Sequence, residues 1–184
     1  MEDSTTTQPS LFQHAIRWGL IMGGISIALT VLLYVVDYTL MVQLKFLFVS
    51  LLIYMGMAIY AGMDYRKSVG GFLGYGKAFQ HGLVAFAISG LVSTLFGLVL
   101  YNVIDSELPQ KLVDASVENA RAMMEQFGAP EDSIEQGLEK ARADTADRFT
   151  ILGQAKGYIW IVVVSAIMSL ITSLFVKKNQ PIEM

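Results

Sequence analysis

The chain has 184 residues, of which 54% are hydrophobic and only 16% are charged, and its formal net charge is −3. Charged residues make up about a quarter of a typical soluble domain, so this composition argues against a soluble globular protein and indicates a membrane protein. The chain contains no cysteine, which excludes disulfide bonds, thiolate metal sites and a cysteine nucleophile.

The first predicted elements are a polar tail and a membrane span. Residues 1–13 begin with "MEDSTTTQPS", a polar stretch with a proline that predicts a disordered tail. The apolar stretch Ala15–Val36 follows, and a helix needs about 20 such residues to cross a hydrocarbon core of about 30 Å. This stretch is longer than the apolar part of a signal peptide, and no small-residue cleavage site follows it. We therefore expect an anchor that stays on the protein.

Three further stretches have the length and composition of membrane spans. The second and third are Leu44–Met63 and Ala78–Ile104, and the fourth is Gly157–Val176 within residues 149–178. Each is too long and too weakly periodic for a helix with one buried face in a soluble core. The predicted fold is an all-α membrane protein with four transmembrane helices, ending in a short tail at residues 179–184.

The segment "VGGFLGYGKAF" at residues 69–79 connects the second and third spans and resembles the phosphate-binding pattern G-x-x-x-x-G-K-[ST]. That pattern needs a β-strand before it and a hydroxyl residue after the lysine to hold Mg²⁺. Here a membrane span precedes the glycines and Ala78 follows Lys77, so we expect no nucleotide binding. A tight turn back toward the membrane is the interpretation we favour, made by Gly70, Gly71, Gly74 and Gly76.

Basic and aromatic residues gather around this turn and after the last span. Aromatic rings settle at headgroup depth, and lysine and arginine favour the cytoplasmic side, so we predict that these residues are interfacial anchors. The predicted anchors are Arg66, Lys67, Phe72, Tyr75, Lys77, Phe79, Lys177 and Lys178. An even number of spans places both termini on the side of this turn, which predicts cytoplasmic N and C termini.

Residues 105–148 predict two amphipathic helices between the third and fourth spans. Apolar positions recur at alternating steps of four and three, first at Val113, Val117, Ala120, Met124 and Phe127 and then at Ile134, Leu138, Ala141 and Thr145. Gly128 predicts the end of the first helix, and Pro130 predicts the first turn of the second. We therefore expect an extramembrane helical hairpin on the extracytoplasmic side.

Five basic and eleven acidic residues give residues 105–148 a net charge of −6. The two apolar seams can pack on each other, lie in the membrane interface, or pair with a second copy, and the short turn favours the first arrangement. Glu131, Glu135 and Glu139 form an acidic stripe that we interpret as a solvated face, because no calcium-loop pattern accompanies it.

Ionisable side chains at membrane depth are costly and therefore candidates for function. Most charged residues near the spans lie at span ends, where they can reach the interface. His81, beside Gln80 and one turn inside the third span, is the exception. We expect an interhelical hydrogen bond there in preference to a proton relay or a metal ligand, because His14 lies at the start of the first span and no second histidine is expected on a neighbouring span. No catalytic residue, cofactor or metal site is predicted.

Small residues recur at four-residue spacing within the spans. Helices in lipid associate where small side chains let their backbones approach closely, so these positions predict helix packing. The predicted packing residues are Gly19, Gly23, Ala58, Gly62, Ser89, Ser93 and Gly97. Ser165, Ser169 and Ser173 repeat the spacing in the fourth span.

Two stretches, "GGFLGYGKAFQHGLVAFAISGLVSTLFGLVLYNVID" and "SAIMSLITSLFVKKN", resemble a bacterial membrane-protein family catalogued as domain of unknown function four-one-nine-nine. The resemblance covers four spans, a long segment before the last span, and a signature carried here by Tyr75, Ala78, Phe79 and Gly82. It implies an integral protein of the bacterial cytoplasmic (inner) membrane and brings no established activity, substrate or catalytic residue.

Two hypotheses on function follow from the sequence. The first is a non-enzymatic structural, assembly or partner-binding protein, which contacts the lipid bilayer and, through the 105–148 hairpin, a second copy or another membrane protein. No catalytic constellation, nucleotide site or nucleic-acid-binding pattern is apparent, which favours this hypothesis. The second is a small transporter or channel subunit that acts as a homo-oligomer, although no inverted repeat or broken helix indicates it. An intramembrane enzyme acting on lipid has less support, because paired acid and base groups are lacking.

Overall fold

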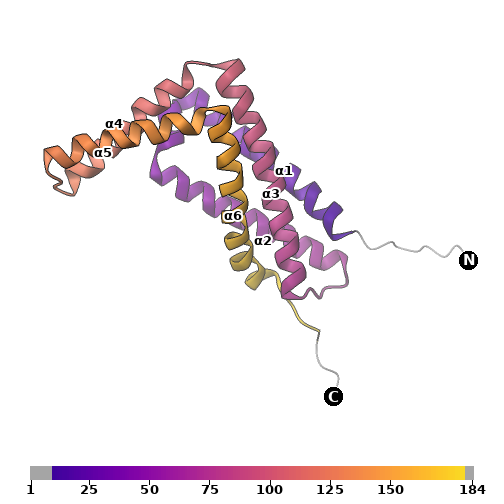
Figure 1. Cartoon of the computed structure of the whole chain (residues 1–184). Coiled ribbons are helices and arrows are strands. Elements are labelled where there is room, and N and C mark those ends of the chain that lie inside the picture. Colours follow the sequence, from indigo (N-terminus) through magenta and orange to yellow (C-terminus); the bar gives the residue numbers. More distant parts are fainter. Residues whose placement is uncertain (1–9, 181–184) are drawn as a thin grey trace, which may run out of the picture. The chain divides into compact units, whose positions relative to one another are not determined.

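A computed structural model describes residues 10–180, so the predictions for residues 1–9 and 181–184 lie outside the described residues. In this range the chain forms six α-helices and two short helical turns (Figure 1). The elements are α1 Leu11–Asp37, the 3-10 turn η1 Tyr38–Val42, α2 Leu44–Ser68, α3 Tyr75–Val99, the π-helical turn η2 Leu100–Ile104, α4 Leu108–Gln126, α5 Glu131–Phe149 and α6 Ile151–Val176. The all-helical fold agrees with the prediction.

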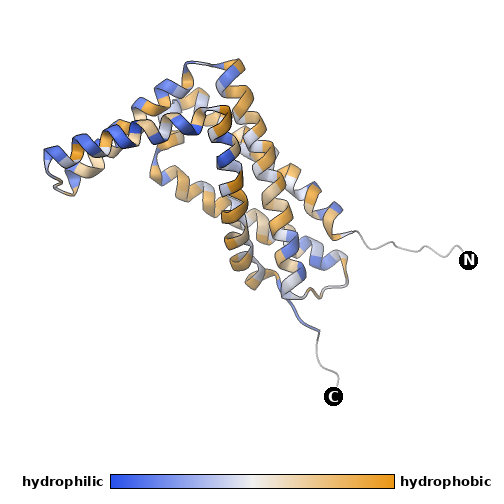
Figure 2. Ribbon diagram, viewed as in Figure 1, coloured by the Kyte–Doolittle hydropathy of each residue, from blue (hydrophilic) through white to orange (hydrophobic). Residues whose placement is uncertain are grey.

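Four of the described helical segments are long and apolar enough to cross a membrane: Leu11–Val42, Leu44–Ser68, Tyr75–Ile104 and Ile151–Val176. Figure 2 shows that the ribbons of α1, α2, α3 and α6 are mostly hydrophobic, whereas α4 and α5 alternate between polar and apolar residues. The four predicted spans are therefore present as helices.

The ends of two spans differ from the prediction. Residues 11–13 belong to α1 and not to a tail. The last span begins at Ile151, well before Gly157, because Thr150 caps the helix. The Thr150 hydroxyl oxygen accepts a hydrogen bond from the backbone N–H of Gly153 at 2.9 Å, which satisfies one of the amide groups left free at a helix start.

Glycine conformations make the turn between α2 and α3. Gly70 and Gly71 have φ angles of +93° and +85°, in the left-handed region that other residues rarely enter. Gly74 and Gly76 lie outside that region, so only two of the four predicted glycines need their conformational freedom. The turn leads to Leu73, whose backbone N–H and C=O both bond to Lys178 at 2.9 Å.

The contacts divide the chain into two compact units. The first unit comprises Met1–Gly24, Leu52–Val92 and Ile161–Met184, and the second comprises Ile25–Leu51 and Ser93–Trp160. The long helices contribute segments to both, and each unit is described by itself below.

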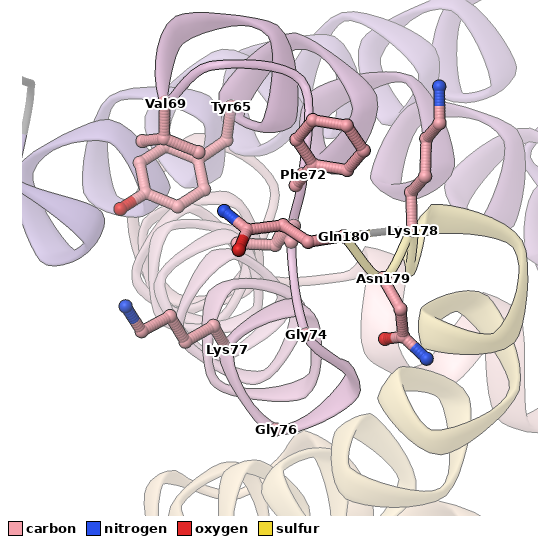
Figure 3. A pocket seen from close by; sticks show the side chains of 10 residues that line it. Tyr65, Val69, Phe72, Gly74, Gly76, Lys77, Lys178, Asn179 and Gln180 are labelled. Atoms are coloured by element: carbon pink, nitrogen blue, oxygen red, sulfur yellow. The ribbon is translucent and has the colours of Figure 1, made fainter. Parts of the chain in front are cut away.

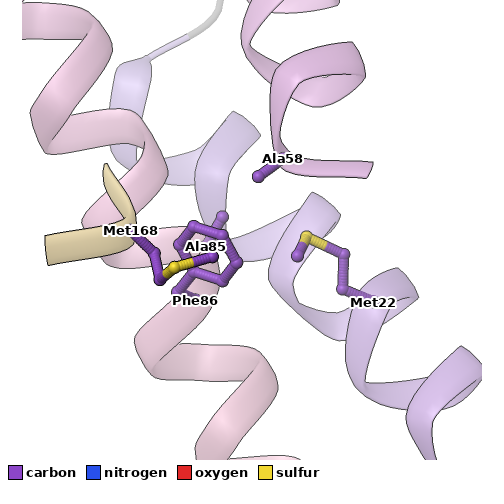
Figure 4. Packing of buried hydrophobic residues seen from close by; sticks show 5 residues of the cluster. All are labelled: Met22, Ala58, Ala85, Phe86 and Met168. Atoms are coloured by element: carbon purple, nitrogen blue, oxygen red, sulfur yellow. The ribbon is translucent and has the colours of Figure 1, made fainter. Parts of the chain in front are cut away.

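Side chains from four helices form the core of the first unit. Met22 of α1, Ala58 of α2, Ala85 and Phe86 of α3, and Met168 of α6 are buried together. Figure 4 shows the Met168 side chain beside the Phe86 ring. A second buried cluster at one end contains Tyr65, Leu73, Ala78 and Val176, with Leu11 packed against it. The start of α1, the α2–α3 connection and the end of α6 therefore meet at one end of this unit.

The second unit has its core where η2 meets the start of α4. Leu100, Leu108 and Leu112 are buried there, and Tyr34, Tyr38 and Phe149 are among the residues packed against them. Asp105 precedes α4, and its Oδ1 accepts hydrogen bonds from the backbone N–H groups of Glu107 and Leu108, both at 3.0 Å. The Tyr34 hydroxyl donates to Oδ2 of the same side chain at 3.1 Å.

Helices α4 and α5 lie side by side in the second unit (Figure 1). Val113, Ile134 and Leu138 of the predicted seam are buried, and Val117, Ala120, Met124, Ala141 and Thr145 are partly buried. Phe127 is an exception to the predicted seam, because it follows the last residue of α4 and is 81% exposed. Gly128, with φ of +70°, ends the helix as predicted, and Pro130 is the N-cap of α5 and not a residue of its first turn.

Candidate functional site

Three helices of the first unit bring His14, Asp64 and His81 into one hydrogen-bonded chain. His14 Nδ1 lies 2.9 Å from His81 Nε2, and His14 Nε2 lies 3.2 Å from Asp64 Oδ2. The prediction that His81 has no second histidine on a neighbouring span is therefore wrong. The prediction failed because α1 begins earlier than expected, at Leu11, so that His14 belongs to the first turn of this helix. We call this chain the His–His–Asp relay.

Aromatic residues hold the relay in place. The Trp18 indole N–H donates to Asp64 Oδ2 at 3.1 Å, and the Trp18 ring meets Tyr60 edge-on, with a centroid distance of 5.4 Å. The Tyr65 ring stacks on His81 with a centroid distance of 5.2 Å and an interplanar angle of 14°. These contacts restrict rotation of the rings and of the carboxylate, so the relay is positioned from α1, α2 and α3 together.

The relay runs from a half-exposed carboxylate to a buried ring. The Asp64 side chain is 48% exposed, the His14 side chain is 12% exposed, and His81 is 1% exposed. The Nδ1 atom of His81 is fully buried and has no hydrogen-bond partner among the described residues. Gln80, which the sequence analysis named beside His81 as a candidate functional residue, is exposed.

The donors fix where the protons sit in the neutral relay. An indole N–H can only donate and an ionised carboxylate can only accept, so Asp64 accepts from both Trp18 and His14 Nε2. His14 Nε2 then carries the proton of the neutral ring, and His14 Nδ1 accepts a hydrogen bond from His81 Nε2. The unpartnered Nδ1 of His81 then carries a lone pair and no proton.

Buried hydroxyl groups of α6 face this part of α3. Ser165, Ser169, Thr172 and Ser173 are each 5% exposed or less. A Cβ added at Gly82 would lie 3.2 Å from Ser169 Oγ, so this hydroxyl sits against the backbone next to His81. Ser169 Oγ is also buried and has no hydrogen-bond partner among the described residues.

The predicted anchors around the α2–α3 turn also contact the end of α6. Arg66 donates to the backbone oxygen of Val176 at 2.7 Å, and the Tyr75 hydroxyl donates to that of Leu170 at 3.0 Å. The Lys178 ammonium lies 5.4 Å from the centre of the Phe72 ring. Lys67, Lys77 and Lys177 are exposed, and Phe79 is partly buried. An open pocket of about 630 Å³ is lined by Tyr65, Phe72, Lys77 and Lys178 among other residues, and Figure 3 shows Gln180 reaching into it between Phe72 and Lys77.

The predicted packing residues lie where helices approach closely. A Cβ added at Gly19 or Gly23 would lie 2.7 Å from Ile88 Cβ or Val92 Cβ of α3, and one at Gly62 would lie 2.7 Å from Val176 Cγ2. Ala58 and Ser89 are buried in the first unit. In the second unit, Ser93 donates to Ser26 at 2.8 Å, and a Cβ at Gly97 would lie 3.2 Å from Gln154 Oε1.

The contacts between the two rings differ from those of a metal site. The two ring nitrogens face each other at hydrogen-bond distance, whereas metal ligands converge on a common point. Within residues 10–180, no group of three or more His, Cys, Asp or Glu side chains could hold a metal ion. Sequence analysis missed His14, Asp64, Trp18 and Tyr65 as parts of one site, although an even number of spans already places His14, Asp64 and His81 at the same end.

These features define a class of protein, which over its described range is an all-helical protein with four helices long and apolar enough to span a membrane and two shorter helices before the last of them. The model of the family described as "Protein of unknown function (DUF4199)" matches residues 17–178, and the chain belongs to this family. The resemblance noted in the sequence is confirmed. The comparison with curated proteins found no match, and the comparison with solved structures found none either.

Proposed function

We propose that the chain is a non-enzymatic protein of the bacterial cytoplasmic membrane that binds a partner protein through its α4–α5 hairpin. In this proposal both termini are cytoplasmic and the hairpin lies on the extracytoplasmic side. The family description supplies no activity, so the proposal rests on the chain's own surfaces.

Helices α4 and α5 of the hairpin are held together by their own contacts. Its seam holds the buried side chains of Val113, Ile134 and Leu138. Two ion pairs cross the seam, Arg142 to Asp114 at 3.0 Å and Arg121 to Glu131 at 3.6 Å. Exposed ion pairs contribute little individually, so the apolar seam supplies most of the stability of this element.

The observation that carries the proposal is the apolar tip of the hairpin. Phe127 is 81% exposed and Met123 is 49% exposed, although the remaining surface of α4 and α5 is strongly polar. Aromatic residues, phenylalanine among them, and methionine are enriched in the cores of protein interfaces. With the net charge of −6 on residues 105–148, the tip fits a partner that offers an apolar pocket with a basic rim.

Contacts in the first unit support the proposed topology. The N-terminal end of α1, the α2–α3 turn and the C-terminal end of α6 all reach the cluster that contains Tyr65 and Val176. The basic residues Arg66, Lys67, Lys77, Lys177 and Lys178 belong to this same end. Lysine and arginine are enriched in cytoplasmic connections, which supports the proposal that this end is cytoplasmic.

Crosslinking in the native membrane tests the proposal. The full chain is crosslinked in cells, purified and compared with Phe127→Ala and, as a control, Gln126→Ala, which changes an exposed residue of the same tip. We expect a crosslinked protein that Phe127→Ala removes and Gln126→Ala retains. Recovery of uncrosslinked chain alone, or of a crosslink that Phe127→Ala leaves intact, would overturn the proposal. Two differently tagged copies of the chain show whether the partner is a second copy.

A second candidate, a small transporter or channel subunit acting as a homo-oligomer, is favoured by the His–His–Asp relay. A hydrogen-bonded chain of ionisable groups within spanning helices is a common feature of proton-coupled transport. Proton flux into vesicles that contain the purified chain tests this candidate. Flux equal to that of protein-free vesicles contradicts it.

A further inference from the structure

We propose that the His–His–Asp relay is a proton-exchange site, in which Asp64 and His14 carry protons between the surface of the first unit and the buried Nδ1 of His81. This inference goes beyond the partner-binding function and does not depend on it. Its ligand is the proton itself. The site rests on the contacts of His14 with His81 at 2.9 Å and with Asp64 at 3.2 Å, and on a fully buried nitrogen without a partner among the described residues.

Proton transfer along the relay balances without movement of heavy atoms. A proton that arrives on His81 Nδ1 lets His81 Nε2 pass its own proton to His14 Nδ1. His14 Nε2 then passes its proton to the Asp64 carboxylate, which can release it at the surface. Each ring gains one proton at one nitrogen and loses one at the other, so the net result is one proton carried outward. The reverse sequence loads His81 from outside.

Uptake of a single proton removes the net charge of the relay. With both rings neutral and Asp64 ionised, the relay has a charge of −1, and one added proton makes it neutral. A neutral site is less costly inside a membrane than a charged one. The other titratable or charged groups around the relay are few. Arg17 lies one turn along α1 from His14, Tyr65 of α2 stacks on His81, and the residues of α6 near His81 are hydroxyl groups.

A second buried polar atom without a partner lies near the inner end of the relay. Ser169 Oγ, like His81 Nδ1, has no hydrogen-bond partner among the described residues, and it packs against Gly82 beside the ring. Buried polar atoms are nearly always hydrogen-bonded, so an exception calls for an explanation. Proton exchange at His81 Nδ1 supplies that explanation for the histidine ring.

The structure permits a test on the two rings themselves, because the chain has only two histidines. The full chain, without a histidine tag, is labelled with 15N-histidine and placed in lipid bilayers, and the ring nitrogens are followed by solid-state NMR. Histidine titrates between about pH 5 and pH 8 when unperturbed, and the series extends below this window to reach a buried ring. We expect the resonances of His14 and His81 to shift together at one midpoint. Independent shifts, or a His81 Nδ1 that stays unprotonated throughout, would overturn the proposal.

Variants separate proton exchange from mere packing. Asp64→Asn keeps an oxygen acceptor for Trp18 but can no longer take up a proton, so we expect slow exchange between the protonated and neutral forms of His81. Gln80→Ala, at the exposed position next to His81, is the control and should behave as the unmodified chain. Unchanged exchange in Asp64→Asn would contradict the assigned route. If this variant does not fold, the titration of the unmodified chain still decides.

Discussion

The close approach of α1 and α3 at Gly19 makes a substitution there informative. In Gly19→Ala the new Cβ would lie 2.7 Å from Ile88 Cβ and 2.8 Å from the backbone oxygen of Ala85. Because one of these atoms is backbone, the two helices must move apart, and overpacking of this kind costs about 1–3 kcal/mol. Alanine recovers roughly 0.5–1 kcal/mol of helix propensity, so we expect a net loss of up to about 2.5 kcal/mol.

Gly24→Ala is the matched control on the same helix, because a Cβ at Gly24 has nothing within 4 Å. Only the gain in helix propensity remains there, roughly 0.5–1 kcal/mol in the stabilising direction. The assay is reversible unfolding in mixed micelles, followed by the helical circular dichroism signal. Equal stability of the two variants, or a Gly19→Ala variant more stable than the unmodified chain, would refute the close packing of α1 on α3.

Three further predictions concern the second unit and the topology. Burial raises the pKa of Asp105, but hydrogen bonds from Tyr34 and from two backbone N–H groups, together with nearby Lys111, lower it to a net value below the ordinary 3.8. A carboxyl group with a lowered pKa in the folded state adds stability above its unfolded pKa, and this stability is lost as the pH falls through the folded value. The melting temperature of the unmodified chain should therefore fall below about pH 4. Asp105→Asn should be less stable at neutral pH and should not show this fall. Ile134→Asp buries a carboxylate at a position that is 2% exposed, which should cost a few kcal/mol and accelerate hydrogen exchange in residues 108–149, while Gln136→Asp, at an exposed position, should not. Alkaline phosphatase fused after Gly128 should be active outside the cytoplasm and inactive when fused after Ser68, and the opposite pattern would invert the topology.

The four spans could be predicted from the sequence because hydropathy over about 20 residues is a direct physical requirement of the bilayer. Their ends could not, since they depend on local hydrogen bonds that hydropathy does not report. Thr150, which caps α6, and Ser10, whose backbone oxygen accepts a hydrogen bond from the N–H of His14 in the first turn of α1, are examples.

The hairpin shows the same division between periodicity and context. Its heptad-like pattern predicted both helices, but it assigned Phe127 to the seam although the helix ends at Gln126. Leu108 and Leu112 were missed because they pack against Tyr34 and Tyr38, which come from a distant part of the sequence.

The His–His–Asp relay could not be predicted from the sequence for a related reason. His14 and His81 are 67 residues apart, and their contact depends on the rotation of α1 and α3 about their own axes. Two of the predicted packing residues, Gly19 and Gly23, set that rotation by bringing α1 against Ile88 and Val92. A small-residue pattern predicts that helices meet, but it does not say which polar side chains are brought together at their ends.

The most direct test of this account is the hydrogen bond between the two histidines. In the 15N-histidine-labelled chain in lipid bilayers, a nitrogen–nitrogen coupling should connect His14 Nδ1 with His81 Nε2, which are 2.9 Å apart. The Asp64→Ala variant, which removes the carboxylate but leaves both rings, serves to assign the signals of His14. A resolved coupling between the two rings is the result that this account predicts. Two uncoupled rings at every pH would contradict the relay and the proton-exchange site built on it.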